Sequence, residues 1–272
     1  MAYAFSWIVW SPWVLGEDGA RVLPPELSVP TSAARLLLAA GILAGPSLSA
    51  FIMTAATEGR EGVRRLLGRL VSWRVGISWY LFSLLGVPLI MLLGTMIYSG
   101  DLPNLRAFGG PSYLLNYLAT YFFVMVLGGP LFEEIGWRGF ALARMQALHG
   151  PLLASVILGV LWALWHLPEF LVPSWAASSG GGGIPGITLF VVTVITFTIV
   201  ITWVFNNTRA SVLLAILAHT SIDAFTVLGE IFPAQAVASA LPFIIGFGAV
   251  GIVLTVVTRG RFDYGRLADA RT

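Results

Sequence analysis

Six ionisable residues stand within otherwise apolar stretches of the sequence: Glu133, Glu134, Arg138, His166, His219 and Asp223. A charged side chain inside a membrane helix costs about 2.5 to 3.5 kcal/mol on insertion scales, so it needs a partner or a function. Glu134 and Arg138 are four residues apart, which places them on one face of a helix. His219 and Asp223 have the same spacing. One buried polar cluster between helices is a simpler explanation than three unrelated structural sites, and we predict such a cluster.

Hydrolysis is the chemistry that these residue types favour. Glu133 points about 100° around the helix from Glu134, so one carboxylate can pair with Arg138 while the other faces a cavity. A carboxylate in that position, together with His166, can act as a general base towards water. The remaining polar side chains can stabilise the oxyanion of acyl hydrolysis.

The role of Asp223 has two alternatives. An ionised Asp223 would accept a hydrogen bond from the ring of His219 and hold its orientation, one helical turn away. A protonated Asp223 would instead donate directly to the oxyanion, as a desolvated carboxylic acid can.

Several other active-site types and partners lack their signatures in this sequence. It contains no HExxH, no GxSxG, no paired intramembrane Asp motif and no Cys. No cofactor is expected, although two His and a carboxylate could still bind zinc. A net charge of +2, with Arg as the basic residue throughout, does not indicate binding to nucleic acid.

The composition predicts an all-α polytopic integral membrane bundle. Hydrophobic residues make up 57% of the chain and charged residues 10%, whereas soluble domains carry about 25% charged residues. About eight transmembrane helices are expected, because helices of about 20 apolar residues cross a bilayer. The predicted spans are residues 2–15, 33–56, 75–98, 113–131, 151–165, 184–205, 212–228 and 241–257. The first is interpreted as a retained span, since it lacks the basic n-region of a signal peptide.

The placement of arginine predicts the orientation of these spans. Arginines gather in residues 58–74, 206–210 and 258–272, and short cytoplasmic loops collect basic residues. We therefore predict that both termini are cytoplasmic and that the chain resides in the plasma membrane. Segment 58–74 has apolar residues on one helical face and arginines elsewhere, which favours an amphipathic helix in the cytoplasmic interface over a solvated loop.

Three motifs in this order resemble those of the CPBP family, also called the Abi family, of CAAX proteases and bacteriocin-processing enzymes. The family motifs are EExxxR, FxxxH and HxxxN or HxxxD. The chain has EEIGWR at 133–138, WALWH at 162–166 and HTSID at 219–223. The resemblance covers a catalytic core at 113–228, within a single membrane domain over residues 1–272.

The resemblance implies a conical helical bundle and roles for the six residues. Glu133 and His166 would activate water, Glu134 and Arg138 would hold the site together, and His219 with Asp223 would face the oxyanion. Two positions depart from the common pattern: Trp162 replaces Phe, a change of bulk only, and Asp223 replaces Asn, which removes a hydrogen-bond donor unless the carboxyl is protonated.

The predicted function is an intramembrane endopeptidase, in which water activated by Glu and His hydrolyses a peptide bond. The substrate would be a membrane-associated peptide or protein, of the prenylated or leader type. Two alternatives remain: a proton-coupled membrane transporter, and a non-catalytic bacteriocin-immunity or scaffold protein. The lipid bilayer is the other expected partner, and the sequence does not define the oligomeric state.

Overall fold

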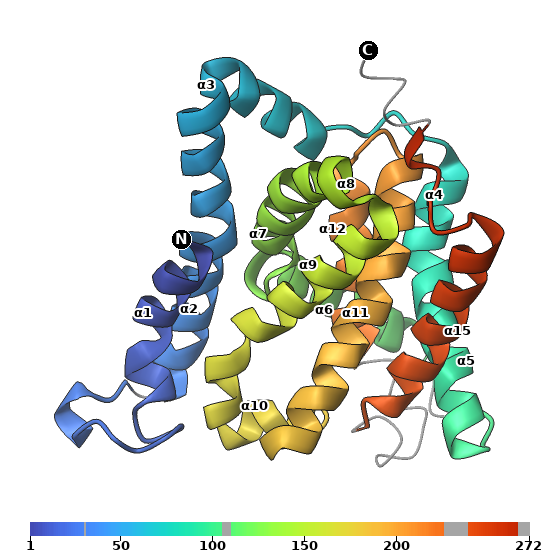
Figure 1. Cartoon of the computed structure of the whole chain (residues 1–272). Helices are drawn as coiled ribbons and strands as arrows, with labels where there is room; N and C mark the ends of the chain where they lie inside the picture. The colour runs from blue at the N-terminus through green and yellow to red at the C-terminus, as the bar shows by residue number, and fades with distance from the viewer. Residues whose placement is uncertain (30, 105–109, 226–238, 266–272) are drawn as a thin grey trace.

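The protein is an all-helical membrane bundle, as the composition predicted. The computed structural model describes residues 1–29, 31–104, 110–225 and 239–265, and these residues form no β-strand. The helices stand side by side in a bundle, with shorter helices at its ends (Figure 1). Each of the eight predicted apolar segments is mainly helical over its described residues, with a break at Gly128 and Gly129 in the fourth, and residues 226–228 of the seventh fall outside the described residues.

The N-terminal helices pack together at one side of the bundle (Figure 1). Helix α1 (Ala2–Val14) leads through a short 3₁₀ turn, η1 (Pro25–Leu27), to α2 (Thr31–Ile42). The chain continues through a π-helical segment, η2 (Leu43–Ser47), into α3 (Leu48–Leu70). Gly59 has φ 62° and ψ −159°, a backbone conformation that suits glycine, and here α3 turns across one end of the bundle.

A second side of the bundle is built from α4 (Ile77–Leu81), the π-helical segment η3 (Phe82–Gly86), α5 (Val87–Ser99) and α15 (Leu241–Val257). Helices α5 and α15 pack closely because small residues lie at their contact. A Cβ atom on Gly94 would lie 2.1 Å from the carbonyl oxygen of Pro242, and one on Gly246 would lie 2.5 Å from that of Ile90.

The central helices carry the six ionisable residues. They are α6 (Pro111–Leu127), α7 (Pro130–Glu134), the π-helical segment η5 (Ile135–Leu142), α8 (Ala143–His149), α9 (Pro151–Trp165), the 3₁₀ turn η6 (Leu167–Leu171), α10 (Pro173–Ser178), α11 (Gly183–Asn207) and α12 (Val212–Asp223). Helix α9 packs along α11, and α12 packs against α6, α7 and α11.

Fewer helices satisfy a length criterion for crossing a membrane than the eight predicted from sequence. In the described part of the chain, three are long and apolar enough, Leu36–Leu70, Ile77–Ser99 and Gly183–Asn207. The bent pair Pro111–Leu127 and Pro130–His149, with an angle of 46°, makes a fourth if it is one span. Helix α1 has 13 residues and rises about 20 Å, less than the bilayer core of about 30 Å. The count of eight therefore stays a prediction.

The arginine-bearing links lie at a common end of the bundle. The turned arm of α3, the link from α11 to α12 and residues 258–265 after α15 lie there, whereas α10 lies at the opposite end (Figure 1). Along the arm, Leu66 is buried, and Arg64 has a side chain that is 80% exposed. This arrangement is compatible with an interfacial helix over 58–74, which stays a prediction, as does the cytoplasmic location of both termini.

Cysteine labelling in intact cells tests the predicted orientation. The chain has no native Cys, so a single Cys placed at Arg64 or at Asp101 gives a clean background. We expect Arg64→Cys to be shielded from a membrane-impermeant thiol reagent and Asp101→Cys to react with it, because the arginine-rich arm should face the cytoplasm. Labelling of Arg64→Cys in sealed cells, with Asp101→Cys protected, would reverse the assigned orientation.

Candidate active site

A break between α6 and α7 places the two adjacent glutamates. Gly129 has φ 126°, and a Cβ atom there would lie only 2.3 Å from Oε1 of Glu133. Glycine therefore meets both the backbone and the space requirements of this turn. The helix restarts at Pro130, so Glu133 and Glu134 stand in its first turns and are both buried.

Glu134 is shared by a cation and an imidazole. Its Oε1 accepts hydrogen bonds from Nη1 of Arg138 at 2.7 Å and from Nδ1 of His219 at 2.9 Å. The guanidinium of Arg138 also stacks 4.3 Å from the ring centroid of Trp162 and lies 3.4 Å from the hydroxyl of Thr198. The predicted pair of Glu134 and Arg138 is thus present in the structure, with both side chains fully buried.

Glu133 faces away from this pair, towards α9. Its Oε2 accepts a hydrogen bond from Nε1 of Trp162 at 2.7 Å and lies 3.9 Å from Nε2 of His166. The expectation that Trp162 changes only the bulk of the usual Phe is wrong, because the indole adds a hydrogen-bond donor that Phe lacks. Trp162 therefore fixes the position of the Glu133 carboxylate.

A buried carboxylate that the sequence analysis missed, Glu169, holds His166. Oε2 of Glu169 lies 2.6 Å from Nδ1 of His166, and Glu169 is 1% exposed. The two residues are three apart at a 3₁₀ turn, where side chains at this spacing stand above one another. An acidic residue three positions after His166 in an apolar stretch was the available sequence signal.

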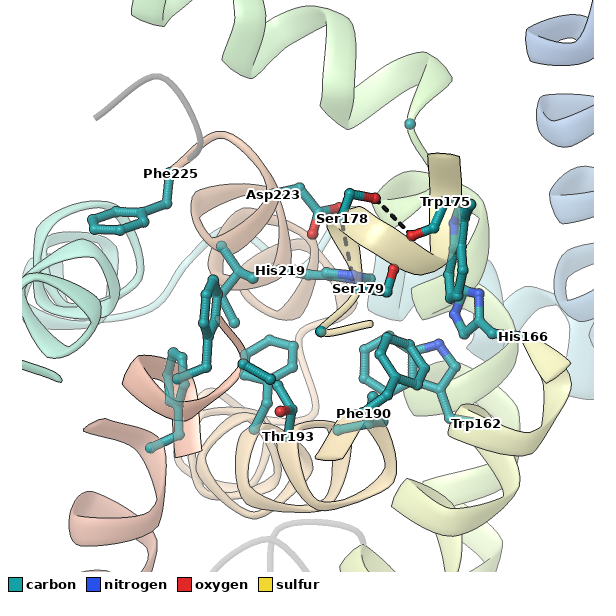
Figure 2. A pocket seen from close by; sticks show the side chains of 18 of the residues that line it. Trp162, His166, Trp175, Ser178, Ser179, Phe190, Thr193, His219, Asp223 and Phe225 are labelled. Carbon is teal, nitrogen blue, oxygen red and sulfur yellow. Dashed lines mark hydrogen bonds and ion pairs between the residues drawn. The ribbon is translucent and has the colours of Figure 1, made fainter. Parts of the chain in front are cut away.

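His219 and Asp223 face each other at the wall of a cavity (Figure 2). Oδ2 of Asp223 lies 3.7 Å from Nε2 of His219, beyond hydrogen-bond distance, and the Asp223 side chain is 34% exposed. The ring of His219 is instead held through Nδ1 by Glu134, a contact that the sequence analysis did not predict. Asp223 is therefore not needed to orient the ring in this arrangement.

The cavity has a volume of about 350 Å³ and lies among α9, α10, α11, α12 and α15. Its wall is largely aromatic, and the ring of Trp175 stacks on His166 with centroids 5.7 Å apart. Ser178, Ser179 and Thr193 add polar groups (Figure 2). Glu133, His166, His219 and Asp223 line it, so four of the six predicted residues reach this space, and Glu134 and Arg138 lie behind them.

The described residues provide no ready set of ligands for a zinc ion. In that part of the chain, no three His, Cys, Asp or Glu side chains are grouped in a way that could hold a metal ion.

Comparisons with known proteins match the same region. Residues 115–225 match a family model described as type II CAAX prenyl endopeptidase Rce1-like. The chain is similar to a CAAX prenyl protease 2 of Methanococcus maripaludis, with 26% identity over 193 residues, covering 69% of this chain and 70% of that protein. Together with the three motifs, these matches support the CPBP family, the family of the CAAX proteases, as the one that the chain resembles.

Proposed function

We propose that the chain is an intramembrane endopeptidase in which Glu133 and His166 activate the attacking water. The observation that carries the proposal is the pair of acceptor atoms at the cavity wall, Oε2 of Glu133 and Nε2 of His166, 3.9 Å apart. A water molecule beside this pair can reach both atoms at hydrogen-bond distance, roughly 2.8 Å. The similarity of the chain to a protease family supports this chemistry.

The reaction has a simple proton balance. Glu133 accepts a proton from water as the water oxygen bonds to the scissile carbonyl carbon, which forms a tetrahedral intermediate with an oxyanion. When the intermediate collapses, the C–N bond breaks and the protonated Glu133 returns the proton to the departing amine. The indole N–H of Trp162 holds Glu133 in place through both steps.

Glu169 sets the tautomer of His166. With Nδ1–H donating to the Glu169 carboxylate, Nε2 carries the lone pair and faces Glu133 and the cavity. The ring can then accept a hydrogen bond from the attacking water. Glu169 is therefore a positioning residue, because it acts through His166.

His219 is suited to stabilise the oxyanion. Its Nδ1–H donates to Glu134, and Nε2 faces the cavity beside Asp223. A ring protonated at both nitrogens would direct Nε2–H at the oxyanion, and the carboxylates of Glu134 and Asp223 would balance its charge. Arg138 holds Glu134 from behind and itself donates to the hydroxyl of Thr198, and neither Arg138 nor Thr198 lines the cavity.

The substrate is a membrane-associated peptide or protein. An aromatic wall favours apolar groups next to the scissile bond. The name of the Methanococcus maripaludis relative makes prenylated peptides that end in a CAAX sequence the first substrates to test, followed by unmodified leader-type peptides. Cleavage by the purified chain separates the protease proposal from the transporter and scaffold alternatives, which predict intact peptides.

The joint role of Glu133 and His166 is tested by a double-mutant cycle. We expect Glu133→Gln and His166→Ala each to lower kcat by about 10² to 10⁴, because each removes the activation of water. The double variant should lose little more, since residues that act as a unit are not additive. Glu61→Gln, at an exposed carboxylate, is the matched control. The joint role would be contradicted if the two losses of kcat multiplied in the double variant. It would also be contradicted if each loss of kcat were accompanied by a corresponding fall in Tm.

The role of Glu169 is tested by comparing two substitutions. Glu169→Gln keeps an oxygen that can accept from Nδ1 of His166, whereas Glu169→Ala leaves Nδ1 unpaired. We expect Glu169→Ala to lower kcat by about 10- to 100-fold with little change in KM, and Glu169→Gln to recover most of this loss. Equal losses in the two variants would show that the hydrogen bond to His166 does not matter for turnover.

The donor role of Trp162 is tested by Trp162→Phe. Phe keeps an aromatic ring near Arg138 but cannot donate to Glu133, so we expect kcat to fall by about tenfold, the value of one hydrogen bond to a charged group. Trp137→Phe is the control, because Trp137 is buried and its Nε1 has no hydrogen-bond partner among the described residues. A larger loss of activity in Trp137→Phe than in Trp162→Phe would exclude this role.

A further inference from the structure

A second cavity lies away from the candidate active site, where the turned arm of α3 meets η5 and α8. It has a volume of about 190 Å³ and is lined by Thr54, Glu58, Arg65, Arg69 and Arg144, with glycines at Gly62 and Gly139. We call it the arginine cavity. None of its lining residues belongs to the proposed catalytic machinery.

Backbone carbonyls hold two of these arginines in place. Nη1 of Arg69 donates to the carbonyl oxygen of Gly139 at 2.7 Å, and Nη1 of Arg144 donates to that of Phe140 at 3.0 Å. The guanidinium of Arg144 also lies 3.8 Å from the ring centroid of Phe140. Both carbonyls belong to the π-helical segment η5. The cationic groups are therefore positioned by the fold before any ligand arrives, which lowers the ordering cost of binding.

The cavity carries more positive than negative charge. Glu58 accepts hydrogen bonds from Nη2 of Arg65 at 2.8 Å and from Nη2 of Arg144, and it is the one acidic residue in the lining. Three arginines against one glutamate leave an excess of two positive charges. Outside the lining, the exposed carboxylate of Glu61 lies 2.9 Å from Nη2 of Arg64 and farther, at 3.8 Å, from Nη1 of Arg65, so it pairs mainly with Arg64.

A buried hydroxyl in the same lining provides a second, independent observation. Thr54 is 2% exposed, and its Oγ1 has no hydrogen-bond partner among the described residues. Buried polar groups in folded proteins are nearly always hydrogen-bonded. A ligand oxygen in the arginine cavity would give this hydroxyl the missing partner.

We propose that the arginine cavity binds a phosphoryl group, supplied by the headgroup of an anionic phospholipid. Guanidinium forks match phosphate oxygens in geometry and charge, and the hydrogen bonds among described residues use only one nitrogen of Arg65 and two of Arg144. The Glu58 carboxylate already shows that an oxyanion fits between these two arginines. Basic pockets at the end of a helical bundle are typical binding sites for such headgroups.

A lipid source is favoured over free phosphate by exposed apolar residues on the helix that contributes most of the cavity lining. On α3 before the bend at Gly59, Leu48 and Ile52 are exposed, and beyond the bend Leu67 is 47% exposed. Acyl chains attached to a headgroup in the cavity would cover apolar residues of this helix. Free inorganic phosphate would gain nothing from them.

Thermal unfolding of the purified full chain in detergent tests the proposal. The chain is titrated separately with dioctanoyl phosphatidylglycerol, dioctanoyl phosphatidylcholine and inorganic phosphate, and an apparent Kd is taken from the rise in Tm. We expect a saturable rise with phosphatidylglycerol, a smaller one with phosphate at higher concentration, and none with phosphatidylcholine. An equal response to phosphate and phosphatidylglycerol would support the phosphoryl site and reject the lipid source.

Matched variants separate the cavity from general surface charge. Arg65→Gln should raise the apparent Kd for phosphatidylglycerol by about tenfold or more, since it removes charged hydrogen bonds to the ligand. Arg64→Gln is the control, because it makes the same charge change on the same arm with a side chain outside the cavity. Arg65→Lys keeps the charge without the planar fork, and we expect an intermediate Kd.

Glu58→Gln gives a result that loss of folding cannot imitate. Removing the competing carboxylate should tighten the binding of phosphatidylglycerol, although two ion pairs are lost and the Tm without lipid falls. The proposal is overturned if no saturable shift occurs in the parent chain, if Arg64→Gln weakens binding as much as Arg65→Gln, or if Glu58→Gln weakens it. None of these measurements depends on proteolytic activity, so they stand apart from the proposed function.

Discussion

The burial of Glu134 is the constraint on which the arrangement of the candidate site depends. A carboxylate with no exposed surface is tolerable only when other groups compensate its charge and donate hydrogen bonds to it, and here both donors bind Oε1. Arg138 does this from the same helical segment, and His219 does it from α12. The requirement to satisfy one buried charge therefore fixes η5 and α12 relative to each other, and with them the imidazole that faces the cavity. Trp162 extends the same arrangement to α9, because its ring lies beside Arg138 while its N–H binds Glu133.

Two glutamates that are neighbours in sequence acquire different chemistry from their surroundings. Glu134 is enclosed with its cation and has no contact with the cavity, so its charge serves the structure. Glu133 has one indole donor and a histidine 3.9 Å away, with the cavity in front of it. In the proposed mechanism Glu133, which is held by the indole and is not ion-paired with an arginine, serves as the base, and the 100° step between successive helical residues is what allows this division. The paired carboxylates thus need only one turn of helix, started by the break at Gly129.

The sequence predicted what depends on local spacing and composition, and missed what depends on contacts between distant segments. The all-helical class, the pair of Glu134 and Arg138 and the gathering of three polar segments follow from apolar periodicity and from residues four apart. The hydrogen bond between Glu134 and His219 joins residues 85 positions apart, and no local pattern indicates it.

The sequence analysis treated Trp162 only as a larger ring than Phe. Its indole N–H becomes important only when α9 packs against Glu133. Glu169 was missed because the 3₁₀ turn after His166 brings it under the ring, whereas a continued α-helix would not stack residues three apart in this way. Length alone does not define the number of spans for a related reason: the break at Gly129 divides a helix that the apolar run over 113–131 presents as continuous.

The π-helical segment η5 links the two cavities of the molecule. Arg138, on one side of it, supports the glutamate and histidine of the candidate active site, and the carbonyls of Gly139 and Phe140, on the other, hold the arginines of the second cavity. A π-helical turn is wider than an α-helical one and is often found at functional sites, because it redirects side chains and carbonyls.

The segment η5 also packs closely against η2, since a Cβ atom on Gly136 would lie 2.5 Å from Cβ of Pro46 in η2. An element packed this tightly cannot shift freely at one end. A change in the position of η5 would therefore alter both the contact of Arg138 with Glu134 and the hydrogen bonds of Arg69 and Arg144 to its carbonyls.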